Sequence, residues 1–124
     1  MKIYLILTLM LILGVSSNTL GQKCKEKFPE VIAATNRGAP KIISKPQPKY
    51  TQEARRHQIT GNLMLRALFH SSGKVQNVCW VSSLPYGLTE NAIKAAYKIV
   101  FEPVNRNGHP VSVTALIYYN FDLY

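Results

Sequence analysis

Three stretches in the second half of the chain are predicted to be strands, and in the first and the third the residues alternate between two faces, the pattern of a strand with one buried face. The first is 62–70 and the second is the Val-rich 75–82. The linker Ser71-Ser72-Gly73-Lys74 is typical of a hairpin turn in which glycine takes a positive φ. The third, from Val111 to Tyr119, predicts a separate last strand. The apolar faces are Leu63, Leu65, Ala67 and Phe69, and then Val111, Val113, Ala115, Ile117, Tyr119 and Phe121.

Two other segments have the features of helices. Thr51 suits the N-cap of a short helix, and Glu53 to Gln58 contains good helix formers. A longer helix is expected from about Thr89, its cap, to Ile99. It has to stop before Pro103, which lacks an N–H and fixes its own φ. Its apolar positions recur at the helical repeat: Leu88, Ala92, Ala95, Ala96 and Ile99.

The order helix, hairpin, helix, strand predicts an α+β domain, a small three-stranded antiparallel sheet with both helices on one face. A crossover can place the last strand beside the first and antiparallel to it, so that its outer side is a sheet edge. The second face of this sheet also carries large apolar side chains, which we expect an N-terminal arm or a second copy of the domain to cover. They are Met64, Leu68, Leu116 and Tyr118.

The N-terminus has the layout of an export signal. Lys2 precedes an apolar run from Ile3 to Val15, which is shorter than a bilayer span requires, and small polar residues follow. We expect residues 1–21 to be a signal peptide cleaved before Gln22, with Val15-x-Ser17 as a weaker cleavage site. The protein is then periplasmic or secreted, whereas a retained leader would anchor it in a membrane.

Residues 22–45 form a basic, Pro-containing arm before a domain at 46–124. Ile42-Ile43 in this arm can add a short strand or pack onto the domain. Export favours pairing of the two cysteines, Cys24 and Cys79, and a bridge between them would tether the arm to the second strand. The alternative is a buried thiol at Cys79 and a free Cys24.

The chain is strongly basic, with a formal net charge of +9, of which the leader contributes only Lys2. Such a charge suits nucleic acid, but export favours an anionic membrane surface, a cell-wall polymer or an acidic protein instead. Scattered lysines and arginines also form an ordinary solvated surface. Charge alone does not choose among these partners.

A catalytic or metal site is not expected. His57, His70 and His109 lack the spacing of metal ligands, and the six acidic residues show no paired-carboxylate spacing. Ser82-Ser83 has no nucleophile-elbow glycines around it. We therefore expect no enzyme and no cofactor, and a small basic hydrolase such as a secreted nuclease is the least favoured function.

Six short motifs, in order and at matching spacing, resemble the C-terminal domain of the TonB family of energy transducers. They span about residues 46–124. One departure is Thr51, where the family usually has Pro, and another is Ile99, where it often has Trp. The residues that carry the resemblance are Tyr50, Ala54, Arg55, Gly61, Gly73, Val75, Ser82, Ser83, Leu88, Phe101, Pro103, Gly108, Pro110 and Val111.

The resemblance implies a protein-binding module of the cell envelope, associated with TonB-dependent transmembrane transport. In that family a sheet edge accepts a short receptor segment as an added strand. The matching edge here is Val111, Ser112, Val113, Thr114, Ala115, Leu116, Ile117, Tyr118 and Tyr119. The alternative is an edge shielded by the arm or by a dimer mate.

A full transducer also has a membrane anchor and a long periplasmic spacer. Roughly two dozen residues separate the expected leader from this domain, and at ~3.5 Å each they cannot cross a periplasm. We therefore expect the binding surface without energy transduction. The alternative function is a secreted basic structural or interaction protein that dimerises or binds an anionic envelope surface.

Overall fold

The computed structural model describes residues 21–25 and 38–124. The expected signal peptide, apart from Gly21, and the middle of the expected arm lie outside the described residues. The elements are β1 (Lys41–Ser44), α1 (Gln52–Arg56), β2 (Gly61–Phe69), β3 (Val75–Ser82), α2 (Leu88–Tyr97), β4 (Val100–Glu102), β5 (Val104–Arg106), β6 (His109–Val111) and β7 (Val113–Phe121).

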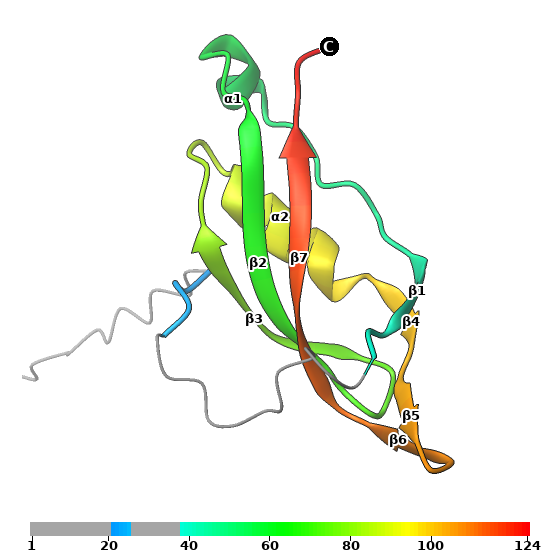
Figure 1. The fold of residues 1–124 in the computed structure, drawn as a ribbon. Helices are drawn as coiled ribbons and strands as arrows, with labels where there is room; N and C mark the ends of the chain where they lie inside the picture. The colour runs from blue at the N-terminus through cyan, green and yellow to red at the C-terminus, as the bar shows by residue number, and fades with distance from the viewer. Residues whose placement is uncertain (1–20, 26–37) are drawn as a thin grey trace, which may run out of the picture.

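The main sheet has the strand order β3-β2-β7 and is antiparallel throughout. β2 and β3 form the predicted hairpin, and Gly73 in its turn has the expected positive φ of 88°. β7 pairs with β2 along its whole length, from Phe69↔Val113 to Gly61↔Phe121. The predicted α+β class and the place of the last strand beside the first are both confirmed (Figure 1).

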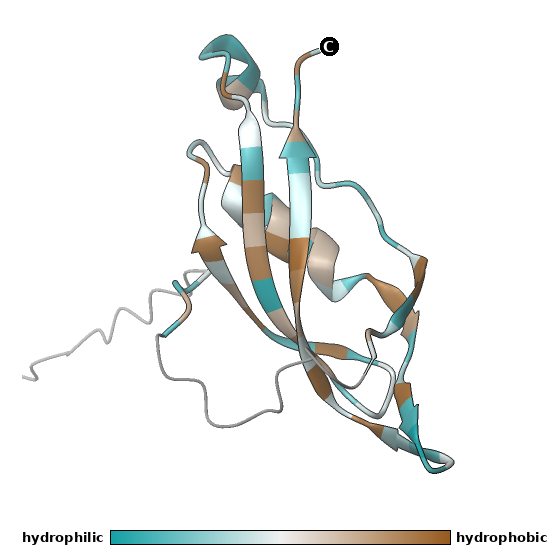
Figure 2. Cartoon of the chain, in the orientation of Figure 1, coloured by the Kyte–Doolittle hydropathy of each residue, from teal (hydrophilic) through white to brown (hydrophobic). Residues whose placement is uncertain are grey.

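The hydrophobic core lies between this sheet and α2, which crosses one face of it (Figure 1). The predicted inward side chains of β2 are all buried, and so is the predicted apolar stripe of α2. Brown positions alternate with paler or teal ones along much of β2 in Figure 2, because every second side chain faces this core. Phe101 of β4 completes it, with its ring 4.9 Å from that of Phe69 and nearly perpendicular.

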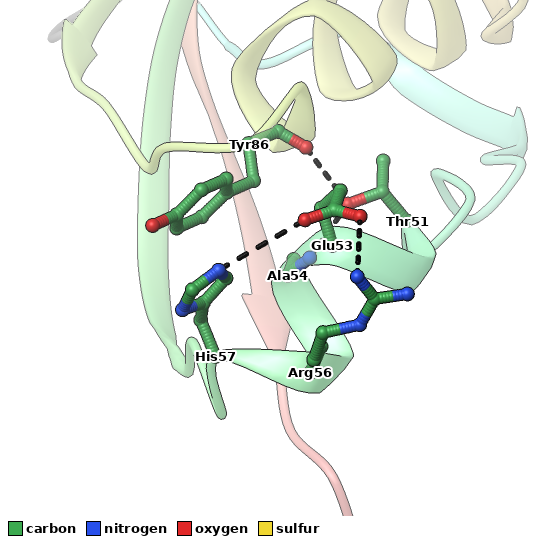
Figure 3. Close-up of polar contacts among 6 residues, drawn as sticks. All are labelled: Thr51, Glu53, Ala54, Arg56, His57 and Tyr86. Carbon is green, nitrogen blue, oxygen red and sulfur yellow. Dashed lines mark hydrogen bonds and ion pairs between the residues drawn. The ribbon is translucent and has the colours of Figure 1, made fainter.

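The helix α1 lies at the end of the sheet where β2 begins and β7 ends (Figure 1). Thr51 is its N-cap, as predicted, and accepts from Ala54 N at 3.1 Å. The Thr51 hydroxyl also donates to Tyr86 O at 2.7 Å, and the His57 ring stacks on Tyr86 at 4.4 Å (Figure 3). Glu53 holds Arg56 at 3.2 Å in the same cluster. These contacts fasten α1 to the loop that precedes α2.

The cap of α2 differs from the prediction. The helix begins at Leu88, after Gly87 in the left-handed conformation, so Thr89 is inside the helix and not its N-cap. Its buried hydroxyl instead exchanges two hydrogen bonds with the backbone of Leu84, donating to O at 2.8 Å and accepting from N at 2.9 Å. The loop before the helix is therefore held by this side chain, while Gly87 supplies the turn.

Two small two-stranded sheets were not predicted as such. β1 pairs with β4, which realises the short strand considered for Ile42-Ile43. β5 and β6 form a hairpin around Asn107-Gly108, both with positive φ, the requirement of a two-residue type I′ turn. Val111 consequently belongs to β6 and pairs with Val104, and Ser112 lies between strands and accepts from Ser71 N. The predicted strand from Val111 to Tyr119 is thus corrected to Val113–Phe121.

Candidate functional site

The outer edge of β7 is the first component of the candidate site. In an antiparallel strand the N–H and C=O of one residue point to the same side, and the side changes at each residue. The Tyr118 carbonyl accepts a hydrogen bond from Lys45, which lies outside the main sheet, so Tyr118 points its backbone outward. Every second residue of the strand has this orientation, so Thr114, Leu116 and Asn120 also point their backbone N–H and C=O outward. These are positions at which another strand can add to the sheet.

A groove with a volume of about 200 Å³ runs along this edge. One wall is β7 and the other is the segment around β1, with core side chains from β2 and the end of α2 at its base. Its lining is almost wholly apolar, and Lys45 supplies the charge. The lining residues are Ala39, Pro40, Ile42, Lys45, Phe69, Ile99, Ala115, Leu116, Ile117 and Tyr118.

Lys45 crosses the groove to reach the edge. Its Nζ lies 2.6 Å from the Tyr118 carbonyl oxygen and 4.7 Å from the centroid of the Tyr119 ring. The second contact is a cation–π interaction, because the ammonium faces a ring. Partial burial lowers the pKa of Lys45 below its usual value, since desolvation disfavours the charged ammonium. The edge is therefore occupied here by a side chain and not by a paired strand.

Tyr119 forms the core side of the same edge. Its side chain is 2% exposed, and within the described part of the chain its hydroxyl has no hydrogen-bond partner. Burial raises the pKa of this phenol to about 12, because the phenolate loses its hydration there. Tyr119 stays neutral at physiological pH and acts as an apolar surface beneath Lys45.

The opposite edge of the sheet, that of β3, is closed at its centre. Cys24 N donates to Trp80 O at 2.9 Å, and Trp80 N donates to Gln22 O at 3.0 Å, so residues 22–24 pair briefly with β3. The predicted disulfide between Cys24 and Cys79 is present, with the two Cα atoms 4.9 Å apart. The neighbouring amide of Val78 donates to the Tyr97 hydroxyl at 3.3 Å. A partner strand therefore meets fewer free groups on β3 than on β7.

The second face of the sheet is only partly covered by the described residues. Met64 and Leu68 are half-buried, whereas Leu116 and Tyr118 are 46% and 53% exposed. The described parts of the arm pair with β3 and β4. Leu116 and Tyr118 thus lie beside the β7 edge, on the face of the sheet away from the core.

The residues that carry the family resemblance do not gather at this groove. At the α1 end of the sheet, Tyr50 packs edge-on against Phe121 at 5.5 Å and donates to the Ile59 carbonyl, and Arg55 covers its ring at 4.9 Å. Gly61 is the first residue of β2, Gly73 sits in the β2–β3 turn, and Gly108 sits at the tip of the β5–β6 hairpin. These residues shape the fold. Sequence reasoning named only the β7 residues of the groove and missed the others, of which Lys45 is the charged one.

The residues considered for catalysis are also scattered. His57 stacks near α1, His70 bonds Ser72 in the β2–β3 turn, and His109 opens β6. Ser82 accepts from Met64 N at the end of β3. Over residues 21–25 and 38–124, no group of three histidine, cysteine or acidic side chains could hold a metal. The helices of this part are too short and too polar to cross a membrane.

Comparison with known proteins adds two findings. Residues 46–123 match the family described as Gram-negative bacterial TonB protein C-terminal. The fold is similar to the solution NMR structure of the TonB C-terminal domain of Pseudomonas aeruginosa, with a TM-score of 0.57 and 22% identity. That match covers 72% of this chain and 91% of the solved one. A search of curated proteins finds no match.

Proposed function

Because this chain belongs to the family of Gram-negative bacterial TonB protein C-terminal domains, we propose that it is an exported module that recognises an extended segment of an outer-membrane partner by strand addition at β7. Membership of this family indicates an association with TonB-dependent transport, a location in the cell envelope and interaction with other proteins. The proposal is that this chain binds by strand addition, that β7 is the edge it uses, and that its partner is an outer-membrane protein.

The outward edge of β7 beside an apolar groove is the observation that carries this proposal. An added strand gains affinity from backbone hydrogen bonds to the outward groups of Leu116 and Tyr118. Side chains at alternate positions of the guest strand then face the groove, where Phe69, Ile99 and Ile42 provide apolar contacts. The closed centre of β3 directs the guest to β7.

A photo-crosslinking amino acid tests which edge meets the partner in living cells. It replaces Leu116 on β7 in one strain and Val81 on β3 in another, two positions that are both partly exposed. We expect the Leu116 position to crosslink to an outer-membrane protein and the Val81 position to give much less of that product. Equal crosslinking from both positions, or from Val81 alone, would contradict binding at β7.

A proline at Leu116 tests the role of the backbone. It removes one outward N–H and leaves the ladder to β2 intact, because the ladder uses the odd-numbered residues of β7. We expect capture of solubilised outer-membrane proteins to fall while the circular dichroism spectrum stays that of the parent. Unchanged capture by a folded Leu116→Pro protein would favour the alternative, a basic structural protein that does not use this edge.

A further inference from the structure

We propose that Lys45 makes the β7 groove selective for a guest strand that carries a carboxylate side chain facing the groove. This inference rests on the proposed strand addition, and it names the chemistry of the guest. The Lys45 Nζ donates to the Tyr118 carbonyl, which is an acceptor that an added strand needs for its own N–H.

A guest strand therefore displaces the Lys45 ammonium from Tyr118. The displaced group stays within the groove, because the Lys45 stem is part of its lining. Apart from the phenol of Tyr118, the rest of that lining is side chains without an oxygen atom. An ammonium in such a place gains most from a charged acceptor, and a carboxylate can replace the lost carbonyl with a stronger, charge-assisted hydrogen bond.

Among residues 21–25 and 38–124, no carboxylate forms an ion pair with Lys45. The carboxylate of Glu53 contacts Arg56 and His57 at α1 instead. Partial burial also lowers the pKa of Lys45, so its ammonium is partly desolvated. A guest carboxylate therefore meets a cation that has no carboxylate partner among the described residues, and because Lys45 is an exposed residue the pair is worth as much as a well-placed surface ion pair.

The geometry also fixes which guest residue carries the carboxylate. The Lys45 ammonium lies over the ring of Tyr119, whose side chain is on the core side of the sheet. The guest residue that pairs with Tyr118 points its side chain to the other face, as Tyr118 does. The carboxylate therefore belongs on a residue next to that one, and shifting it by a single position sends it to the wrong face.

Three labelled nine-residue peptides of alternating valine and threonine provide the test. In the first, glutamate replaces one central valine. In the second, glutamine replaces the same valine, and in the third, glutamate replaces an adjacent threonine. Affinities are measured by fluorescence anisotropy at physiological salt for the parent protein and for Lys45→Gln, Lys45→Arg and Lys49→Gln. Lys49→Gln removes the same charge from an exposed position that is not part of the groove lining.

We expect the parent to prefer the first peptide over the second by roughly fivefold, as for a favourable ion pair. Lys45→Gln should lose this preference, while Lys45→Arg and Lys49→Gln should keep it. The third peptide should gain little from its glutamate. A preference that survives in Lys45→Gln, a preference that is lost equally in Lys49→Gln, or no preference in the parent would each overturn the role of Lys45.

The Leu116→Pro protein separates this failure from failure of the proposed function. If all peptides bind the parent equally and all lose affinity in Leu116→Pro, strand addition stands and selection by Lys45 is wrong. If affinity is unchanged in Leu116→Pro, or if no peptide binds the parent, strand addition at β7 is itself wrong and the inference falls with it.

Discussion

At the scale of single residues, the ring of Tyr119 and the ammonium of Lys45 are in contact, 4.7 Å apart. Tyr119 lies in the core with an unpartnered hydroxyl within the described structure, and Lys45 lies over its ring. A buried hydroxyl without a partner has lost its hydration and gained nothing in return. The ring and the hydroxyl of Tyr119 therefore have separate effects, and the ring alone supports Lys45.

Replacing Tyr119 with Phe should leave the free energy of unfolding at pH 7 unchanged or raise it by up to about 1 kcal/mol. Phe keeps the ring, so Lys45 retains its cation–π contact. Urea denaturation at neutral pH measures the change. A clear loss of stability would mean that the hydroxyl has a partner in solution.

The same variant should also change the alkaline pH dependence. The pKa of Tyr119 is raised from 10.0 to about 12 on folding, so the unfolded chain loses this proton first as pH rises. The stability that this group contributes is complete below pH 10 and is lost as pH rises through about 12. The difference in unfolding free energy between parent and Tyr119→Phe should therefore shift in favour of the variant between those pH values, and a constant difference would contradict this assignment.

Sequence alone can identify Tyr119 as an inward residue, because its place in the alternation of β7 makes it so. It cannot identify Lys45. The partners of that side chain are 73 and 74 residues away along the chain, and one lysine in a basic arm carries no local signal. The groove forms where the segment around β1 packs beside the edge of β7. This packing depends on the whole folded chain.

At the scale of elements, α1 is a helix of five residues, too short to be stable by itself. Its stability comes from its N-cap, from buried Ala54 and from the cluster with Tyr86. Thr51 serves two of these contacts with one hydroxyl, which accepts from inside the helix and donates to the loop before α2.

Replacing Thr51 with Val keeps the volume and removes both hydrogen bonds. We expect the protein to lose about 1–2 kcal/mol of stability, the usual effect of an N-cap combined with one weak additional hydrogen bond. Thr51→Ser retains the hydroxyl and is the matched control, which should lie close to the parent in thermal or urea unfolding. Equal stability of the Val and Ser variants would show that α1 does not depend on this cap.

The long elements were predictable and the short ones were not. β2 and β7 have nine residues each, which is enough for an alternating pattern to emerge, and the eight-residue β3 is rich in valine and follows a recognisable turn. β4, β5 and β6 have three residues each, too few for a period, and β1 pairs with a strand more than fifty residues away. The dipeptide Asn107-Gly108 is typical of a tight turn, but the flanking residues do not reveal by themselves that they form a separate hairpin.

At the scale of the whole molecule, the two edges of the main sheet are unequal. The centre of β3 is occupied by residues 22–24, and the disulfide holds them there. The edge of β7 has a groove and one lysine side chain. Edge strands are protected in native proteins when pairing with them is unwanted, so the open edge is the one available to partners.

Replacing both Cys24 and Cys79 with Ser should release residues 22–24 from β3. Closing a loop between residues 55 apart is worth up to about 4 kcal/mol, so stability should fall by as much as that. The Trp80 amide should exchange its hydrogen faster, whereas the Val78 amide, held by the Tyr97 hydroxyl, should change little. Trp80 is the one tryptophan of the chain, so its fluorescence reports the same release, and unchanged exchange and emission would show that the segment stays in place without the bond.

The covalent closure of β3 also sets how many neighbours one molecule can recruit through its main sheet. A protein whose sheet has two open edges can bind one neighbour at each edge. Each copy that joins then presents a new edge, and the assembly grows without limit. With β3 blocked around Trp80, β7 is the more open edge of the main sheet, so growth beyond a strand received at β7 is disfavoured. Copies of this chain that met edge to edge would stop at a pair, which is a safe property for a protein that offers an exposed edge.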